Sequence, residues 1–330
     1  MRNMKKLCLL VLCFSVSIVV YSQTLQRAIL SHEGTLTQYD GDHWLDAIDN
    51  AVAGDIVYLT PGTFYGNLTV TKAISIIGSG IAETDAFYNE DELATAFAGC
   101  GTSTPSTVIH GDINIAIPGS ITLTSTLLEG ILVPCYYGFE PSVTISKSVT
   151  NPIFKRCHFG WYLSASEEVT NLKLEDCYIG RLRCNNVTSA VIFNCWISQT
   201  ENGYELDFTN CFVGSNGGNG DTHNCHFINS IVLDTRDYNT FSYCVTRNQT
   251  GAGNSFSNCK VADDWFFYRY TKAQLLEHEY IGDDGKVMGP LGGPVPFTLK
   301  PSNPYVSSST LTYNSSTKKL NVSMTIKKGE

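Results

Sequence analysis

A short phrase that recurs from Ile153 to Val261 limits the possible folds more than any other feature of the sequence. Each copy has an apolar residue, a cysteine or serine three positions later, and a second apolar residue two positions after that. Successive cysteines are 14 to 20 residues apart, a variable period that is typical of one coil of a β-solenoid. The copies centre on Cys157, Cys177, Cys195, Cys211, Cys225, Ser230, Cys244 and Cys259.

The spacing within the phrase predicts a strand with a corner before it. The cysteine and the second apolar residue follow the two-residue alternation of a strand, so both point to one side. The first apolar residue breaks that alternation, so the chain must bend between it and the cysteine. Asparagine, which tolerates the left-handed conformation, often stands just before the cysteine. We expect these corner amides to stack and to hydrogen-bond along the solenoid. They are Asn194, Asn210, Asn224, Asn229 and Asn258.

The cysteines have two explanations. Twelve are present, and ten of them lie beyond residue 22, which in an exported chain ordinarily indicates disulfides. The repeat instead places most of them at one inward position, where cysteine acts as a small buried hydrophobe. Equivalent side chains on stacked strands point the same way, which is poor disulfide geometry. We favour an internal ladder of thiols, with disulfides between coils as the alternative.

The first 22 residues have the features of an export signal. Arg2, Lys5 and Lys6 precede an apolar run, 7–20, that is too short to span a bilayer comfortably. We expect cleavage after Ser22 and export to the periplasm, cell surface or medium, with an uncleaved anchor as the alternative. Loss of these three cations takes the formal net charge from −9 to −12. Neither nucleic acid nor an anionic membrane surface would attract such a chain, and no later apolar run predicts membrane insertion.

The segments outside the repeat predict how the solenoid ends. Trp44, Ala47, Ile48 and Ala51 follow helical spacing, which predicts an amphipathic helix that caps the N-terminal end of the solenoid. Two antiparallel strands are predicted near the C-terminus, either over the far end or as a small appended module. The chain divides into the signal (1–22), a β-helix with its cap (23–300, with a loop excursion over 82–107) and a C-terminal strand pair (301–330).

Two runs resemble known β-helix proteins. Residues 46–64, followed by 74–80, resemble the opening of pectin-lyase-like proteins, and residues 282–297 are similar to the end of β-helices in exported proteins of Bacteroidota. The resemblance covers most of residues 40–300 and implies an all-β, right-handed parallel β-helix. Enzymes with this fold usually act on acidic polysaccharides, as lyases or as glycoside hydrolases. Such lyases often hold calcium, and no other cofactor or metal is expected.

Catalytic residues for these reactions are weakly represented. Asp234, Arg236 and Asp237 form the cluster most like that of a lyase, but a solvated loop between Ser230 and Cys244 is the better interpretation. Asp263 and Asp264 resemble the paired aspartates of polygalacturonases, which act as acid and base. The other elements of that family, a His-Gly pair and an Arg-x-Lys triplet, are missing downstream, so a turn is the better interpretation.

The repeat also predicts an outward column of aromatic side chains. If the cysteine and the next apolar residue point inward, the residue between them points outward. Exposed aromatic rings stack well on sugar rings, and a contiguous exposed patch indicates a binding site. The alternative is that a loop or the C-terminal segment covers the column. Its members are His158, Tyr178, Trp196, Phe212 and His226.

The sequence therefore favours an exported β-helix protein that binds polysaccharide through this column. Two alternatives remain: a polysaccharide lyase or glycoside hydrolase for acidic glycans, and a structural or adhesive surface protein that binds another protein. Two basic pairs, Lys155 with Arg156 and Arg181 with Arg183, would suit an acidic glycan or be ordinary surface charge.

Overall fold

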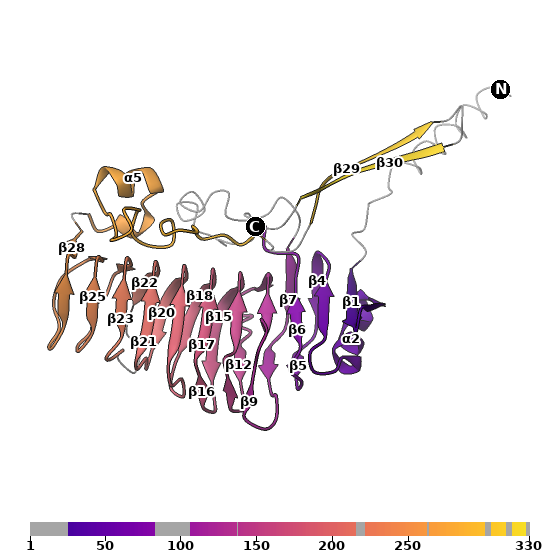
Figure 1. Cartoon of the computed structure of the whole chain (residues 1–330), viewed down its shortest axis with the longest axis horizontal. Coiled ribbons are helices and arrows are strands. Elements are labelled where there is room, and N and C mark those ends of the chain that lie inside the picture. Colours follow the sequence, from indigo (N-terminus) through magenta and orange to yellow (C-terminus); the bar gives the residue numbers. More distant parts are fainter. Residues whose placement is uncertain are drawn as a thin grey trace.

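The computed structural model describes residues 26–82, 106–136, 138–215, 222–262, 264–300, 305–314 and 319–327. The chain is mostly β, with short parallel strands stacked side by side along the long axis of the molecule (Figure 1). The predicted export signal lies outside the described residues, as does most of the excursion predicted over 82–107.

Two long sheets run along this stack, and the chain alternates between them. Sheet A has 12 strands, parallel except for the first two, and its order follows the sequence after the initial hairpin. Its strands are β1 (Arg27–His32), β2 (Thr35–Asp40), β3 (Ile56–Leu59), β6 (Ser75–Ile77), β10 (Leu128–Glu129), β14 (Ile153–Lys155), β17 (Leu172–Glu175), β19 (Ala190–Phe193), β21 (Leu206–Thr209), β23 (His226–Ile228), β25 (Thr240–Ser242) and β27 (Ser255–Ser257).

Sheet B has 13 parallel strands, and a third sheet of three strands closes the middle coils. Sheet B comprises β4 (Gly62–Tyr65), β5 (Leu68–Val70), β7 (Thr107–His110), β8 (Ile113–Ile115), β11 (Ile131–Val133), β12 (Val143–Ile145), β15 (His158–Ala165), β18 (Tyr178–Arg183), β20 (Trp196–Glu201), β22 (Phe212–Ser215), β24 (Ile231–Val232), β26 (Val245–Thr246) and β28 (Lys260–Val261). The third sheet comprises β9 (Ile121–Thr122), β13 (Val149–Thr150) and β16 (Val169–Thr170).

The predicted corner joins each strand of sheet A to the next strand of sheet B. In seven consecutive coils the residue before the cysteine or serine has a left-handed φ between 51° and 54°. Non-glycine residues rarely adopt this conformation, and asparagine does so most readily, so the corner prediction is confirmed. The seven residues are Arg156, Asp176, Asn194, Asn210, Asn229, Tyr243 and Asn258.

The copy of the phrase around Cys225 does not form the same corner as the other copies. The backbone N–H of Cys211 donates to Ser230 Oγ at 3.1 Å, so Ser230 continues the cysteine column. Cys225 instead follows Asn224, whose φ of 54° marks a second left-handed corner, on the entry side of sheet A. The overlap of two copies in the sequence therefore reflects two different corners of one coil.

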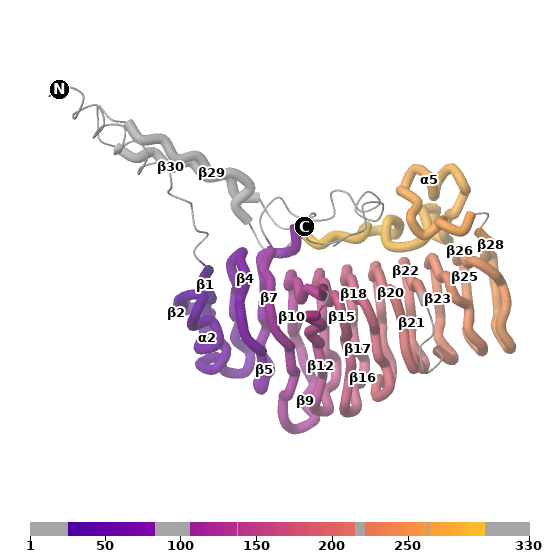
Figure 2. Tube along the Cα trace, turned by 180° about the vertical axis from the view of Figure 1, so that it is seen from behind, coloured from indigo at the N-terminus to yellow at the C-terminus, as the bar shows by residue number. Residues whose placement is uncertain are grey.

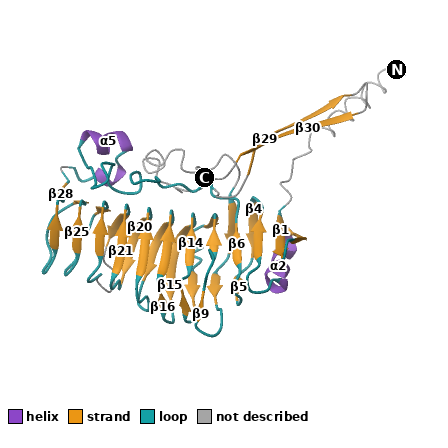
Figure 3. Cartoon of the chain, in the orientation of Figure 1, coloured by secondary structure: helices purple, strands orange, loops and turns teal. Residues whose placement is uncertain are grey.

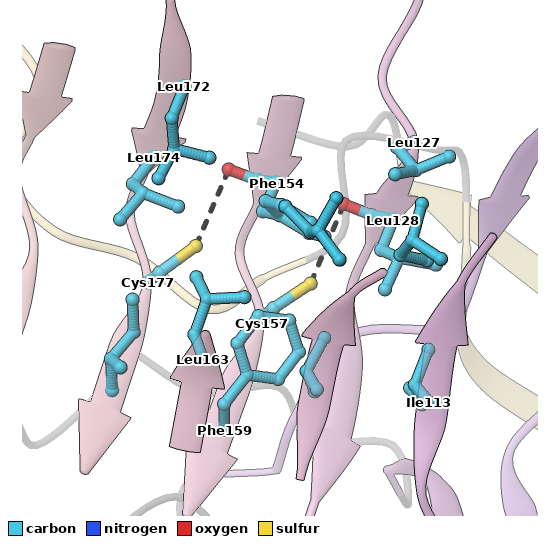
Figure 4. Packing of buried hydrophobic residues seen from close by; sticks show 14 of the residues in the cluster. Ile113, Leu127, Leu128, Phe154, Cys157, Phe159, Leu163, Leu172, Leu174 and Cys177 are labelled. Carbon is cyan, nitrogen blue, oxygen red and sulfur yellow. Dashed lines mark hydrogen bonds between the residues drawn. The ribbon is translucent and has the colours of Figure 1, made fainter. Parts of the chain in front are cut away.

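The cysteines form the predicted internal ladder. The backbone N–H groups of Cys177 and Cys195 each donate to the Sγ of the cysteine one coil later, at 3.4 Å. Figure 4 shows the thiols of Cys157 and Cys177 pointing into the core, toward carbonyl groups of an earlier strand. The described cysteines are all free, and burial raises the pKa of the Cys211 thiol to about 12. Beside this ladder the rings of Phe208, Phe227, Phe241 and Phe256 stack in order, with centroids 4.7 to 4.9 Å apart.

A helix and an antiparallel hairpin lie at the N-terminal end. A 3-10 turn (η1, Gly41–His43) leads into α2 (Trp44–Asn50), which buries Trp44, Ala47 and Ile48. The sequence did not predict the hairpin of β1 and β2, which pairs antiparallel with β3 at the edge of sheet A. Helices occur near both ends of the stack (Figure 3).

After β28 the chain leaves the stack and turns back along it. We call residues 264–300 the C-terminal strap; it contains η2 (Phe267–Arg269) and α5 (Lys272–Glu277). Figure 2 shows the strap running from α5 back toward the early coils. The backbone N–H of Ile81 donates to the carbonyl oxygen of Leu299 at 3.2 Å, which fixes the far end of the strap.

The strap also changes the role of the corner amides. The side-chain amides of Asn194 and Asn229 donate to Val295 O and Asp283 Oδ1, both in the strap. At these two coils the corner amides therefore bond to the strap, and Asn194 also hydrogen-bonds along the stack to Asp176.

Beyond the strap, β29 (Tyr305–Asn314) and β30 (Lys319–Lys327) pair antiparallel, as predicted. Across the described ranges no helix has both the length and the apolar character that crossing a bilayer requires.

Candidate binding face

The strap covers the aromatic column that the sequence predicted to be exposed. Trp196 and Phe212 are each 3% exposed, and their rings stack with centroids 3.8 Å apart. Exposure of this column was therefore the wrong prediction, because apolar strap residues pack on it and form a second core. That core comprises Ile81, Leu132, Trp196, Phe212, Ile231, Val245, Phe267, Tyr270, Leu275, Tyr280, Val287, Met288, Phe297 and Leu299.

The predicted column itself is confirmed for four of its five members: His158 lies beside Tyr178, with ring centroids 4.4 Å apart, and Tyr178 stacks on Trp196 at 6.5 Å. His158 is 6% exposed, and burial lowers its pKa to about 3, so the imidazole is neutral. Tyr178 is half-buried, with its hydroxyl 3.4 Å from Ser198 Oγ. His226 lies on β23 in sheet A rather than in the column, with Nδ1 3.0 Å from Asp207 Oδ1. The five side chains do not form one exposed surface.

The three residues of the predicted lyase cluster lie in the loop between β24 and β25, where two of them pair with each other and the third bonds to the next loop. Arg236 and Asp234 form an ion pair at 3.2 Å. Asp237 Oδ1 accepts from the backbone N–H of Ala252 at 2.7 Å, which joins this loop to the loop of the next coil. The Asp237 contact holds two stacked loops together. Asp263 lies outside the described residues.

A group of half-buried aromatic and arginine side chains lies further along the same sheet B strands. Trp161 and Tyr162 lie on β15, Arg181 and Arg183 on β18, and Glu201 on β20. The strand register places Tyr162 beside Arg181, and Arg183 beside Glu201. We call these five residues the aromatic–arginine face.

A bulge in β15 produces this face. The register between β15 and β18 shifts between Phe159 and Tyr162, so the alternation that starts at the corner does not continue. Gly160 and Gly180 lie at this point, where a Cβ on Gly180 would stand 2.4 Å from the Gly160 carbonyl oxygen. Only glycine permits so close an approach of the two coils.

The face is rigid and carries more positive than negative charge. The guanidinium carbon of Arg183 lies 3.6 Å from the centroid of the Tyr162 ring, and that of Arg181 lies 4.9 Å from Trp161. Both arginines donate to Tyr162 Oη, at 2.8 and 2.7 Å, and Arg183 Nε donates to Glu201 at 2.8 Å. The Glu201 side chain is 11% exposed, whereas those of Arg181 and Arg183 are 36% and 42% exposed. The cations are therefore the groups that solvent and ligands meet.

A second aromatic group occupies earlier coils of sheet B. His110 stacks on Phe139 at 3.9 Å and hydrogen-bonds to the hydroxyl of Tyr136. Tyr65, which is 69% exposed, pairs with His110 across β4 and β7. Aromatic side chains therefore recur along sheet B toward its N-terminal end.

The spacing of the repeat did not indicate the aromatic–arginine face. Arg181 pairs with Tyr162, 19 residues earlier, whereas Cys157 and Cys177 are 20 residues apart, so counting from the corner would have paired Arg181 with Trp161 instead. The repeat phrase stops at Phe159, which is why these positions were not assigned to a surface.

Metal chemistry has no evident site here: the described ranges hold no group of three or more histidine, cysteine or acidic side chains placed to bind an ion. No model of a known protein family matches the chain, and no curated protein matches it either.

Proposed function

We propose that this chain is an exported, right-handed parallel β-helix of the pectin-lyase-like kind, which binds an acidic polysaccharide on its aromatic–arginine face. The alternation of strands between two parallel sheets supports a β-helix. The strong right-handed preference of parallel strand connections supports the handedness. The signal-like residues 1–22 support export.

The stacked pairing of aromatic rings and guanidinium groups carries the proposal. Trp161 is half-buried, and the part of its ring that reaches the surface can pack on the C–H groups of a sugar ring. A guanidinium binds a carboxylate or sulfate through two parallel hydrogen bonds, and its planar fork is already held in place by Tyr162 and Glu201. The aromatic pair lies on β15 and the arginine pair on the adjacent strand β18, about 4.8 Å away, so an acidic chain that crosses the coils would meet one pair and then the other.

Binding is favoured over hydrolysis by the charges on the face. A glycoside hydrolase needs two carboxyl groups on either side of the bond that it cleaves. The five residues of the face include one carboxylate, Glu201, and it is paired with Arg183. A structural or adhesive role remains the other candidate, in which a protein partner would occupy this surface.

The test is calorimetric titration with polygalacturonate, alginate and chondroitin sulfate, with neutral dextran alongside. We expect binding to at least one acidic polymer, weakening with added salt, and none to dextran. Trp161→Ala, and the double change Arg181→Ala with Arg183→Ala, should each weaken binding about tenfold or more, which is about 1.4 kcal/mol.

Matched controls come from other surfaces. Tyr204→Ala removes an aromatic side chain that is 52% exposed, and Lys173→Ala removes an exposed cation from sheet A, so both should bind as the wild type does. Retained affinity in Trp161→Ala, or equal binding of dextran, would contradict the proposal. Unsaturated sugar products in the same mixtures would instead favour the lyase alternative.

A further inference from the structure

The strap holds a pocket of about 300 Å³ that lies apart from the aromatic–arginine face and shares only Tyr270 with the second core. Its volume is at the lower end of the range for small-molecule sites. Five side chains line it: Asp264, Phe266, Arg269, Tyr270 and Gln274. A carboxylate, a guanidinium, an amide and a phenol thus surround one aromatic ring, all from residues 264–274, which run from the start of the strap into α5.

The acceptor of this pocket is fixed in place. Asp264 Oδ1 accepts from the backbone N–H of Phe266 at 3.0 Å, and Asp264 Oδ2 accepts from the Tyr270 hydroxyl at 3.1 Å. A carboxylate has about four acceptor positions, so each oxygen retains capacity beyond these bonds. Because both oxygens are held, the carboxylate is preorganised to accept from two adjacent donors of a ligand.

The amide donor is fixed by the start of α5. Thr271 and Gln274 form a capping box, in which Gln274 Oε1 accepts from the backbone N–H of Thr271 at 2.9 Å. The same oxygen accepts from Thr271 Oγ1 at 2.9 Å. The carbonyl side of the amide therefore faces the helix end, and Nε2 with its two N–H donors faces away from it.

Arg269 and Phe266 complete the lining. The guanidinium carbon of Arg269 lies 5.3 Å from the centroid of the Phe266 ring, within cation–π range. Phe266 is 52% exposed, so its ring offers an apolar face to the pocket. Asp264 and Arg269 contribute opposite charges, which leaves the lining without a net charge to select an anion or a cation.

We propose that this pocket binds one ring of a neutral, polyhydroxylated ligand, that is, a sugar unit. Two neighbouring hydroxyl groups would donate to Asp264 and accept from Gln274 and Arg269, while the apolar side of the ring packs on Phe266. The neutral charge balance distinguishes this site from the aromatic–arginine face, and it stands whether or not that face binds an acidic polymer.

The test is saturation-transfer NMR and calorimetry on the full chain with glucose, galactose, mannose and xylose, up to about 10 mM, a range that detects dissociation constants near 1 mM. We expect at least one of them to bind. Gln274→Glu is the decisive variant, because glutamate preserves the capping box while replacing the amide donors with a carboxylate. It should weaken binding at least tenfold with an unchanged melting temperature.

Two further variants complete the design. Asp264→Asn should also weaken binding at least tenfold, whereas Glu277→Gln, on the same helix but outside the pocket, should leave it unchanged. Trp161→Ala should bind the monosaccharide normally, which separates this site from the aromatic–arginine face. Failure of all four sugars to bind, or equal binding by Gln274→Glu and wild type, would overturn the proposal.

Discussion

Each residue at the corner between sheets A and B meets two requirements. Its backbone must adopt a left-handed φ, and its side chain must fit the groups that pack over the corner. Asparagine satisfies the backbone, and the repeat predicted it. Arg156 and Asp176 occupy equivalent positions, yet both are buried, and Arg156 pairs with Glu129 at 3.0 Å. The repeat could not predict these buried charges, because it contains no information on the strap that excludes water from the corner.

Asp176 should make stability depend on pH. Burial raises its pKa from 3.8 to about 7, although nearby Arg156 opposes the rise. The folded state therefore binds this proton more tightly than the unfolded state does. Its contribution to stability is complete below about pH 4 and is lost as the pH rises to about 7.

We expect Asp176→Asn to be more stable than the wild type at pH 8, by roughly 1–3 kcal/mol at the scale of 1.36 kcal/mol per pKa unit. Asparagine suits the left-handed corner, and it removes the cost of a buried charge. The difference in unfolding free energy between the two proteins should shrink as the pH falls toward 4. Urea unfolding of both proteins at pH 4, 6 and 8 checks this.

His158 makes the comparison with the variant necessary. Its lowered pKa gives the opposite trend, in which stability is lost as the pH falls from about 6.5 to about 3. The pH profile of the wild type alone would combine the two effects. His158 is present in both proteins, so the difference in unfolding free energy between wild type and Asp176→Asn reports the carboxyl group alone. A gap that stays constant from pH 4 to 8 would show that Asp176 does not titrate in this range.

Among the elements, the strap and the β15 bulge account for what sequence reasoning missed. The bond between Asn194 and Val295 joins residues 101 positions apart, and the strap has no periodic pattern that would indicate its partner. The bulge shifts the alternation after Phe159, so Trp161 and Tyr162 could not be placed by counting from the corner. Local spacing predicted the strands and corners because their residues are near in sequence; packing between distant segments left no such trace.

Two glycines of the strap allow its docking to be tested. Gly293 has a φ of 72°, and a Cβ there would stand 2.3 Å from Asn210 Nδ2, whose side chain is buried between neighbouring coils. Gly285 has nearly the same φ, 73°, but a Cβ there meets nothing within 4 Å. Alanine strains the backbone equally at both positions, by about 1 kcal/mol.

Gly293→Ala should therefore lower the melting temperature more than Gly285→Ala, because only the first forces the strap away from the corner. The extra cost should be about 1–3 kcal/mol, as for overpacking at other buried contacts. Limited proteolysis should also cut the strap of Gly293→Ala faster. Equal melting temperatures for the two variants would show that the strap does not press on Asn210.

Over the whole molecule, each coil contacts chiefly the coils before and after it, so stability is a property of neighbours. The two ends are finished differently. At the N-terminal end β1 and β2 add antiparallel strands to sheet A, and α2 packs with them. At the other end β27 and β28 are the last strands of their sheets among the described residues, and Phe256 ends the ring stack only partly buried.

This asymmetry predicts where the structure opens first. Amide hydrogens of residues 255–261 should exchange faster than those of residues 206–213, because the last coil has a neighbour on one side and the inner coil has one on each. Residues 56–59 should exchange slowly, since the hairpin and α2 lie over that end. Hydrogen exchange measured by mass spectrometry on the full chain resolves these three segments. Protection of residues 255–261 equal to that of residues 206–213 would mean that another chain or segment completes the C-terminal coil, and it would locate an interface there.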